Sequence, residues 1–107
     1  MKRGDVIIAA LPGDYGKPRP TLVVQADAFA ALDSLIVCPM TSDGDTAGIL
    51  RVPVDPDDDN GLRKPSLIMV EKINAISRNR CRDTIGRLSA DRMAAVDLAL
   101  RLILFAE

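Results

Sequence analysis

The chain has 107 residues and a formal net charge of −1, and 48% of its residues are apolar. This length predicts a single domain over residues 1–107, and the near-neutral charge gives no overall electrostatic signature of nucleic-acid binding. Histidine is missing, which excludes histidine-based catalysis, and the lack of tryptophan with only one tyrosine and two phenylalanines argues against an aromatic base-stacking surface.

Five short segments rich in β-branched residues predict strands, because each is bounded by Pro, Gly, Asp or Ser. They span residues 5–11, 21–26, 34–40, 49–55 and 66–73. Between the second and third segments, "ADAFAALDS" can hold one or two helical turns with Phe29 and Leu32 directed inward. No helical crossovers separate the strands, so we expect a mainly β domain, a small, partly closed SH3-like barrel rather than a βαβ sheet.

The fourth segment predicts an edge strand with one wet face. Leu50, Val52 and Val54 fall on one side of it, and Pro53 on the other side has no N–H to donate to a neighbouring strand. The residues that follow, "DPDDDNGLRKP" at 55–65, have no apolar period and predict an exposed acidic loop.

The segment "LSADRMAAVDLALRLILFAE" at the C-terminus predicts a helix with Ser89 as its N-cap. Asp97 and Arg101 are four residues apart and can pair on a narrow polar stripe. Elsewhere the helix is apolar on nearly every side, which is more than one packing face requires. The excess indicates either a second copy of the chain, giving a homodimer, or deep burial of the helix in its own barrel.

The two cysteines do not have the spacing of a zinc site. Cys38 lies in an apolar run and is read as a small hydrophobic residue, whereas Cys81 lies between arginines. No segment reaches membrane-spanning length, and the first apolar run is too short for a signal peptide. We therefore expect no metal and no membrane association, and a cytoplasmic location with reduced thiols.

Arg19 stands between Pro18 and Pro20, directly before the second predicted strand. The prolines hold Lys17 and Arg19 extended, which frames the guanidinium more rigidly than solvation alone requires. A rigid loop that carries a surface arginine is the other interpretation.

Three further groups of polar residues are candidates for a site. Thr41 and Ser42 end the third predicted strand, where their hydroxyls either cap a turn or point into a cleft beside the Arg19 loop. Glu71 is either an outward strand residue or a partly buried carboxylate. A basic cluster either contacts phosphates or is a solvated face; its members are Arg78, Arg80, Arg82 and Arg87.

The segments "RGDVIIAAL", "RPTLVVQ", "LIVCPMTS", "SLIMVEKINAIS" and "IGRLS" follow one another in this order. Their order and spacing resemble the MazF/PemK family of type II toxin–antitoxin ribonucleases over nearly the whole chain. The resemblance implies a CcdB/PemK-type barrel with a C-terminal α-helix and a homodimer. It also implies cleavage of single-stranded RNA without a metal or other cofactor, and neutralisation by a cognate antitoxin protein.

The resemblance places the family's catalytic arginine at Arg19, its hydroxyl residue at Thr41 and an acidic position at Glu71. These assignments suit the chemistry, because RNA supplies its own nucleophile, the ribose 2′-hydroxyl. The protein then has to stabilise an anionic phosphorane, a task that suits a guanidinium, and the expected products are a 2′,3′-cyclic phosphate and a 5′-hydroxyl. The residues expected to contact the RNA are Tyr15, Lys17, Ser42, Arg78 and Arg80.

The chain departs from the family's pattern in two places. The loop before Arg19 lacks a Glu-Gln segment, and Asn74 stands where relatives carry arginine, so Arg78 or Arg80 is expected to take over that phosphate contact. Two other function classes stay open. One is a CcdB-like poison of DNA gyrase that acts by binding, although this chain lacks the tryptophan on which that class relies, and the other is a catalytically silent interaction module.

Overall fold

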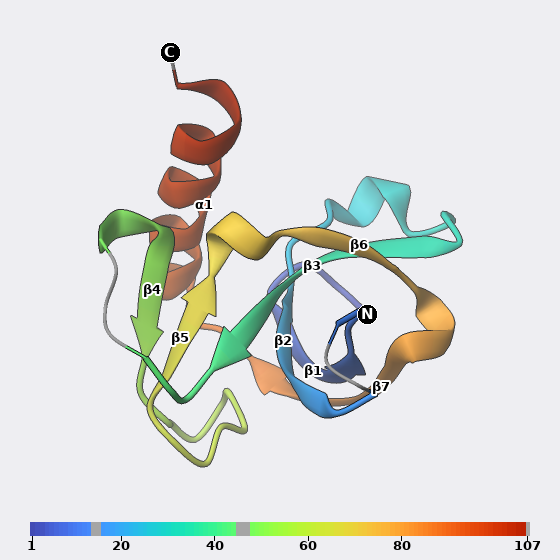
Figure 1. Cartoon of the computed structure of the whole chain (residues 1–107), viewed down its shortest axis with the longest axis horizontal. Coiled ribbons are helices and arrows are strands. Elements are labelled where there is room, and N and C mark those ends of the chain that lie inside the picture. The colour runs from blue at the N-terminus through green and yellow to red at the C-terminus, as the bar shows by residue number, and fades with distance from the viewer. Residues whose placement is uncertain (14–15, 45–47, 107) are drawn as a thin grey trace.

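The structure is a computed structural model that describes residues 1–13, 16–44 and 48–106. Its strands are β1 (Asp5–Ala10), β2 (Pro18–Val23), β3 (Ser34–Thr41), β4 (Arg51–Val54), β5 (Ser66–Met69), β6 (Asn74–Ser77) and β7 (Cys81–Arg87). Short 3-10 turns lie between them at η1 (Asp27–Phe29), η2 (Gly48–Leu50), η3 (Val70–Lys72) and η4 (Arg78–Arg80). The helix α1 (Ala90–Phe105) follows β7 (Figure 1).

The strands pair in the order β4-β5-β3-β2-β1-β7, and all the pairs are antiparallel. Along one edge β3 pairs with β2, and along the other it pairs first with β6 and then with β5. The path β5-η3-β6 therefore follows β3 as one interrupted strand. Within the described residues, the two terminal strands of this order, β4 and β7, do not pair with each other. The curled sheet is therefore a partly closed barrel, which confirms the predicted fold.

The five predicted strands are present with shifted ends, and β6 and β7 are additional. Most side chains of β7 are exposed, and its place in the sheet comes from backbone pairing with β1. In β6, Ile76 alone is buried. Neither segment carries the apolar pattern on which a sequence-based strand prediction depends.

β4 lies at the edge of the sheet, as its proline predicts. Val52 and Val54 are buried while Pro53 is exposed, so the predicted alternation is confirmed. The acidic loop 55–65 is exposed at most positions, but Asn60 and Leu62 are buried.

The inward placement predicted for Phe29 and Leu32 is wrong. Their side chains are 58% and 50% exposed. A helical turn does form there, but η1 is a single short turn with no buried residue, and it is too short to lay an apolar face on the sheet.

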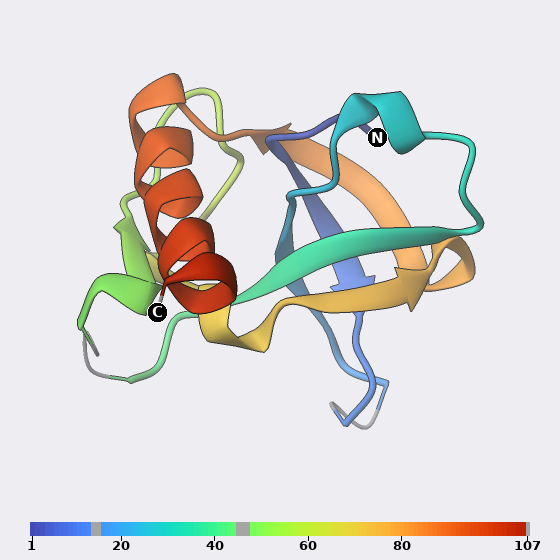
Figure 2. The same cartoon turned by 90° about the horizontal axis from the view of Figure 1, so that it is seen from above.

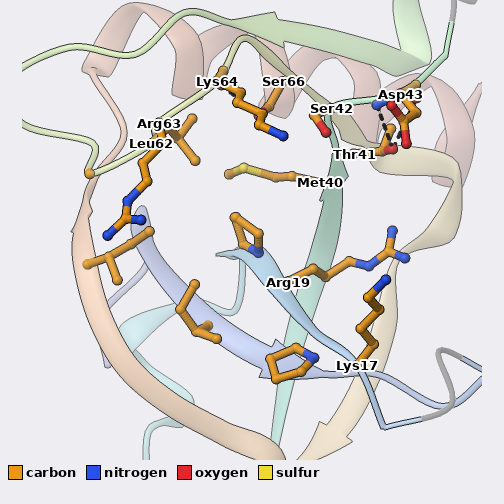
Figure 3. A pocket seen from close by; sticks show the side chains of 15 residues that line it. Lys17, Arg19, Met40, Thr41, Ser42, Asp43, Leu62, Arg63, Lys64 and Ser66 are labelled. Carbon is orange, nitrogen blue, oxygen red and sulfur yellow. Dashed lines mark hydrogen bonds between the residues drawn. The ribbon is translucent and has the colours of Figure 1, made fainter.

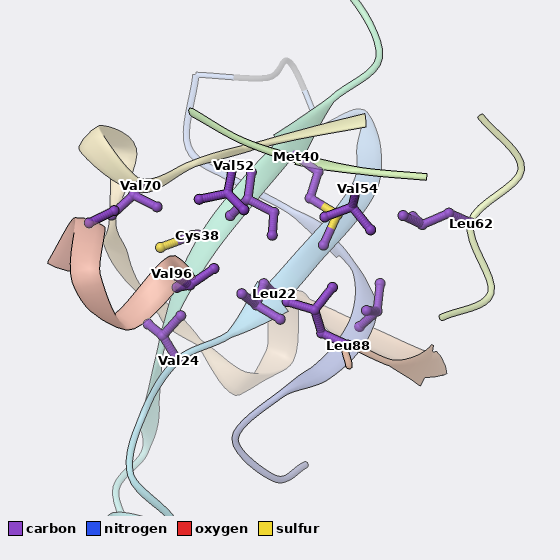
Figure 4. Close-up of a cluster of buried hydrophobic side chains, with 13 residues drawn as sticks. Leu22, Val24, Cys38, Met40, Val52, Val54, Leu62, Val70, Leu88 and Val96 are labelled. Carbon is purple, nitrogen blue, oxygen red and sulfur yellow. The ribbon is translucent and has the colours of Figure 1, made fainter. Parts of the chain in front are cut away.

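Both faces of the central strands are buried. One cluster lies between the sheet and α1, where Val96 faces Leu22 (Figure 4), and a second lies inside the curl of the sheet. The neighbours Val6 and Ile7 belong to different clusters, because successive side chains of a strand point to opposite faces.

The helix begins as predicted, with the Ser89 hydroxyl accepting a hydrogen bond from the Arg92 amide at 3.2 Å. Asp97 pairs with Arg3 rather than with Arg101, so this carboxylate ties α1 to the N-terminal segment. Despite its apolar composition, α1 is not a membrane span, and neither is any other helix in the part of the chain that the structure describes.

Part of the apolar surface of α1 is uncovered. The helix lies at one end of the molecule beside β4 and η3 (Figure 2), and its buried residues are Val96 and Ala99. The exposed fractions reach 46% at Leu98, 54% at Leu104 and 77% at Phe105. Deep burial of the helix in its own barrel, one of the two alternatives, is therefore wrong.

Candidate functional site

The ladder between β2 and β3 ends at the pair Thr21 and Pro39, and beyond it the two strands diverge. β3 continues along β5 through Met40 and Thr41, whereas the start of β2 stays paired with β1. Prolines suit the end of this ladder, because they have no N–H with which to extend it. A pocket lies where the strands separate.

The pocket has a volume of about 550 Å³ and lies between β2, the end of β3 and residues 61–66 (Figure 3). Several apolar side chains line it, namely Ile8, Pro18, Pro20, Met40, Leu62 and Ile85. Among the described residues of the lining, the positively charged ones are Lys17, Arg19, Arg63 and Lys64, and the negatively charged one is Asp43. Because the whole chain has a net charge of −1, positive charge is concentrated here, and the pocket suits a polyanion.

Arg19 lies in β2, opposite Ala9 of β1, and is half-buried. Thr21 is fully buried, and its hydroxyl donates to the Arg19 carbonyl at 3.1 Å. The arginine backbone is therefore fixed by a strand ladder, two prolines and a buried hydroxyl, while its side chain reaches the pocket. Lys17 is exposed beside it.

Thr41 and Ser42 both line the pocket, across it from Arg19 in Figure 3. The Thr41 hydroxyl donates to the Asp43 carbonyl at 3.0 Å and accepts from the Asp43 amide at 3.1 Å. The hydroxyl thus caps a turn, as one of the two alternatives predicts, and it does so at the pocket's edge, as the other predicts.

Glu71 is in η3 and is not among the residues that line the pocket. Its carboxylate pairs with Arg51 of β4, whose Nε donates to Oε1 at 2.9 Å and to Oε2 at 2.7 Å. The side chain is 28% exposed, so Glu71 is the partly buried carboxylate of the two alternatives. The structure does not bring it together with Arg19 and Thr41 in this pocket.

Cys38 is a core residue with no exposed surface. Burial, with a smaller contribution from the Glu71 charge, raises the pKa of its thiol to about 12. A thiol in this state is protonated and inert at neutral pH, which confirms the interpretation of Cys38 as a small hydrophobic residue.

Two of the predicted RNA contacts lie elsewhere on the molecule. Arg78 donates to the carbonyl of Leu32 at 2.7 Å and to that of Ala30 at 2.9 Å, so it holds the turn after η1. Arg80 is exposed in η4, the 3-10 turn that also contains Arg78, and neither arginine lines the pocket. Tyr15 lies outside the described residues.

The sequence alone does not single out two cations of the pocket, Arg63 and Lys64. They lie at the end of the predicted acidic loop, and both side chains are exposed beside the buried Leu62. The sequence signal for them is the dipeptide Asn60-Gly61, which is typical of a tight turn that returns the chain to the body of the protein and which stands one residue before the Arg-Lys pair.

A metal-binding cluster of three or more Cys, Asp or Glu side chains does not occur within residues 1–13, 16–44 and 48–106. The described residues of the pocket lining supply guanidinium, ammonium, hydroxyl and carboxylate groups.

A family model, the PemK-like, MazF-like toxin of type II toxin–antitoxin systems, matches residues 2–104. The chain is 38% identical over 105 residues to a probable endoribonuclease MazF of Mycolicibacterium smegmatis, with 97% of this chain and 96% of the relative covered. The solved toxin MazF-mt6 of Mycobacterium tuberculosis superposes with a TM-score of 0.78 at 28% identity, covering 91% of this chain and 92% of that one. An endoribonuclease in complex with its cognate antitoxin, from a mycobacterial species, shares the fold, with a TM-score of 0.81 at 20% identity over 97% and 94% of the two chains.

Proposed function

Because the chain belongs to the family of PemK-like, MazF-like toxins of type II toxin–antitoxin systems, we propose that it is a sequence-specific endoribonuclease that cleaves single-stranded RNA. The observation that carries the proposal is the cationic pocket with Arg19 and Thr41 on its two sides. Cleavage of messenger RNA would inhibit translation and growth, and such a substrate places the activity in the cytoplasm.

In the proposed reaction the ribose 2′-oxygen forms a bond to phosphorus and the bond from phosphorus to the 5′-oxygen breaks. The proton of the 2′-hydroxyl passes to a base, and the departing 5′-oxygen gains a proton. The products are a 2′,3′-cyclic phosphate and a 5′-hydroxyl. The substrate supplies the nucleophile, so the reaction requires neither a metal nor a covalent enzyme intermediate.

Arg19 is the proposed stabiliser of the negative charge that develops on the non-bridging phosphate oxygens. A guanidinium presents donors in a fixed planar arrangement, and the strand, the prolines and the bond from Thr21 limit how far it has to reorganise. Removing a preorganised donor of this kind typically costs about 3 kcal/mol of transition-state stabilisation. Thr41 and Ser42 are the proposed hydroxyl contacts to the ribose or phosphate, and Lys17 supplies a further charge.

Two carboxylates compete for the role of base. Glu71 is the base that the family resemblance favours, but it would have to leave its ion pair with Arg51. Asp43 lines the pocket and is exposed, and its backbone is fixed by Thr41. A base has to reach the proton that it abstracts, so the geometry favours Asp43.

The exposed apolar face of α1 supports a homodimer. The exposed fractions are 46% at Leu98, 40% at Leu102 and 77% at Phe105, whereas most apolar residues of the strands are buried. A second copy of the chain is the partner that is always available to cover such a face. A cognate antitoxin is the second proposed protein partner, by analogy with the solved mycobacterial complex.

The test is incubation of the purified protein with a long single-stranded RNA in EDTA, with the fragment ends mapped. Discrete cuts that leave cyclic phosphates support the proposal and give the recognition motif. No cleavage by a folded protein would favour the binding classes, either a CcdB-like gyrase poison or a silent interaction module, and gyrase inhibition would separate those two.

A further inference from the structure

The loop of residues 55–64, here the Asn60 loop, is built around a buried amide. The Asn60 side chain has no exposed surface. Its Oδ1 accepts from the amides of Leu62 at 3.0 Å and Asp57 at 3.2 Å, and its Nδ2 donates to the Asp55 carbonyl at 2.9 Å. One side chain thereby fixes the path of the loop from residue 55 to residue 62.

Backbone contacts hold the same loop against β7. The Arg87 amide donates to the Asp59 carbonyl at 2.8 Å. A Cβ at Gly61, whose φ is +71°, would lie 2.1 Å from the Ile85 carbonyl oxygen, and one at Gly86 would lie 2.3 Å from the Asp59 carbonyl oxygen. Only glycines permit this approach of the two backbones, so the loop packs directly against β7.

The anchored backbone of the Asn60 loop determines where the side chains of Arg63 and Lys64 lie. Leu62 is buried in the core cluster, and Arg63 and Lys64 follow it as exposed cations on the pocket wall. Figure 3 shows them on the other side of the pocket from Arg19 and Lys17, with the Lys64 ammonium directed into the pocket and the Arg63 guanidinium directed away from Lys64. The pocket thus receives positive charge from two independent elements, β2 and the Asn60 loop.

We propose that Arg63 and Lys64 bind the RNA backbone at phosphates next to the scissile one, and that Asn60 is the positioning residue that holds this second binding site in place. The inference rests on the proposed function, since it takes RNA as the ligand. A nucleic-acid strand carries one charge per nucleotide, so two cationic groups on opposite walls fix which phosphate stands at Arg19. The second site therefore binds and aligns the strand without taking part in the bond changes.

The first experiment measures affinity apart from cleavage. The probe is a single-stranded oligonucleotide with the cleaved sequence and a 2′-deoxyribose at the cut site, which removes the nucleophile. The double variant Arg63→Gln/Lys64→Gln is expected to raise Kd about tenfold at low salt and to reduce the slope of log Kd against log salt by about 1. With cleavable RNA, KM rises and the single-turnover rate at saturation stays within about twofold of the unaltered chain.

The matched control is Lys72→Gln/Arg82→Gln, which removes the same charge from exposed residues outside the pocket lining. It is expected to leave Kd within about twofold. Equal weakening by both double variants overturns the proposal, because net charge alone then explains the effect. A saturated rate that falls as far as in Arg19→Ala also overturns it. If the unaltered chain neither cleaves RNA nor binds the probe, the proposed function itself fails.

The second experiment tests Asn60. If it acts through Arg63 and Lys64, Asn60→Ala weakens probe binding in the unaltered background and has little further effect when those two cations are already glutamine. Additive losses in the two backgrounds would contradict the positioning role. Where Asn60→Ala does not fold, Asn60→Ser replaces it, because a serine hydroxyl can still accept from the Leu62 amide, loses the reach to the Asp55 carbonyl and buries no charge.

Discussion

Arg51 and Glu71 form a two-point ion pair between β4 and η3, with Nε 2.9 Å from Oε1 and Nη2 2.7 Å from Oε2. Both side chains are less than a third exposed, at 19% and 28%. The pair joins the edge strand to the segment between β5 and β6, outside the pocket that holds Arg19. Such an arrangement suits a structural role for Glu71.

The variant Glu71→Gln leaves Arg51 without its counter-ion. Hydrogen bonds to charged groups contribute about 2 kcal/mol, so the free energy of unfolding should fall by roughly that amount in urea denaturation. The cleavage rate and its pH dependence should stay unchanged, because the pair lies outside the pocket lining. If Glu71→Gln instead abolishes the dependence of the rate on low pH, Glu71 is the base.

The variant Asp43→Asn removes the carboxylate that lines the pocket. If Asp43 is the base, the single-turnover rate falls by about two to four orders of magnitude and no longer decreases as the pH is lowered. Stability should change little, because the carboxylate is exposed. A pH–rate profile that keeps its acidic limb in Asp43→Asn would contradict this assignment.

The variant Leu98→Asp places a charge on the uncovered face of α1. Sedimentation should show a shift from dimer to monomer, while far-UV circular dichroism stays the same, because Leu98 is half-exposed in the single chain. Leu32→Asp is the matched control, since Leu32 is 50% exposed away from the helix. An unchanged sedimentation coefficient for Leu98→Asp would remove α1 from the proposed interface.

The Cys38 thiol makes stability depend on alkaline pH. Burial raises its pKa from 9.0 to about 12 in the folded chain. The unfolded chain therefore loses this proton first, and the stability that the protonated thiol contributes is present below pH 9 and falls as the pH rises towards 12. In the variant Cys38→Ala, the free energy of unfolding measured in urea should depend less steeply on pH between 9 and 12. An unchanged pH dependence would show that other groups cause it.

The parts of the fold that carry an apolar pattern can be predicted from the sequence. The alternation around Pro53 predicted the edge strand, and Ser89 predicted the start of the helix. β7 was missed because backbone pairing, rather than burial of its side chains, holds it against β1. Phe29 was misplaced because an apolar residue in a short turn has no periodic neighbours to fix the face on which it lies.

In the site, too, residues that local sequence constrains can be predicted, and residues that depend on distant contacts cannot. Arg19 could be singled out because its two prolines are adjacent in the sequence and constrain its backbone locally. Arg63 and Lys64 could not, because their place in the pocket depends on Asn60 and on contacts between the loop and β7 that bridge distant parts of the chain. Likewise, the partner of Glu71 is 20 residues away, and no local pattern reveals that pairing.

The proposed function depends on Arg19 as the residue that stabilises the transition state of RNA cleavage without a metal. The most direct measurement is the single-turnover rate of RNA cleavage in EDTA for Arg19→Ala beside Arg82→Ala, with both variants shown to melt as the unaltered chain does. We expect the rate to fall on the order of a hundredfold or more in Arg19→Ala and to stay unchanged in Arg82→Ala. A folded Arg19→Ala variant that cleaves RNA within a few-fold of the unaltered rate would contradict this role of Arg19.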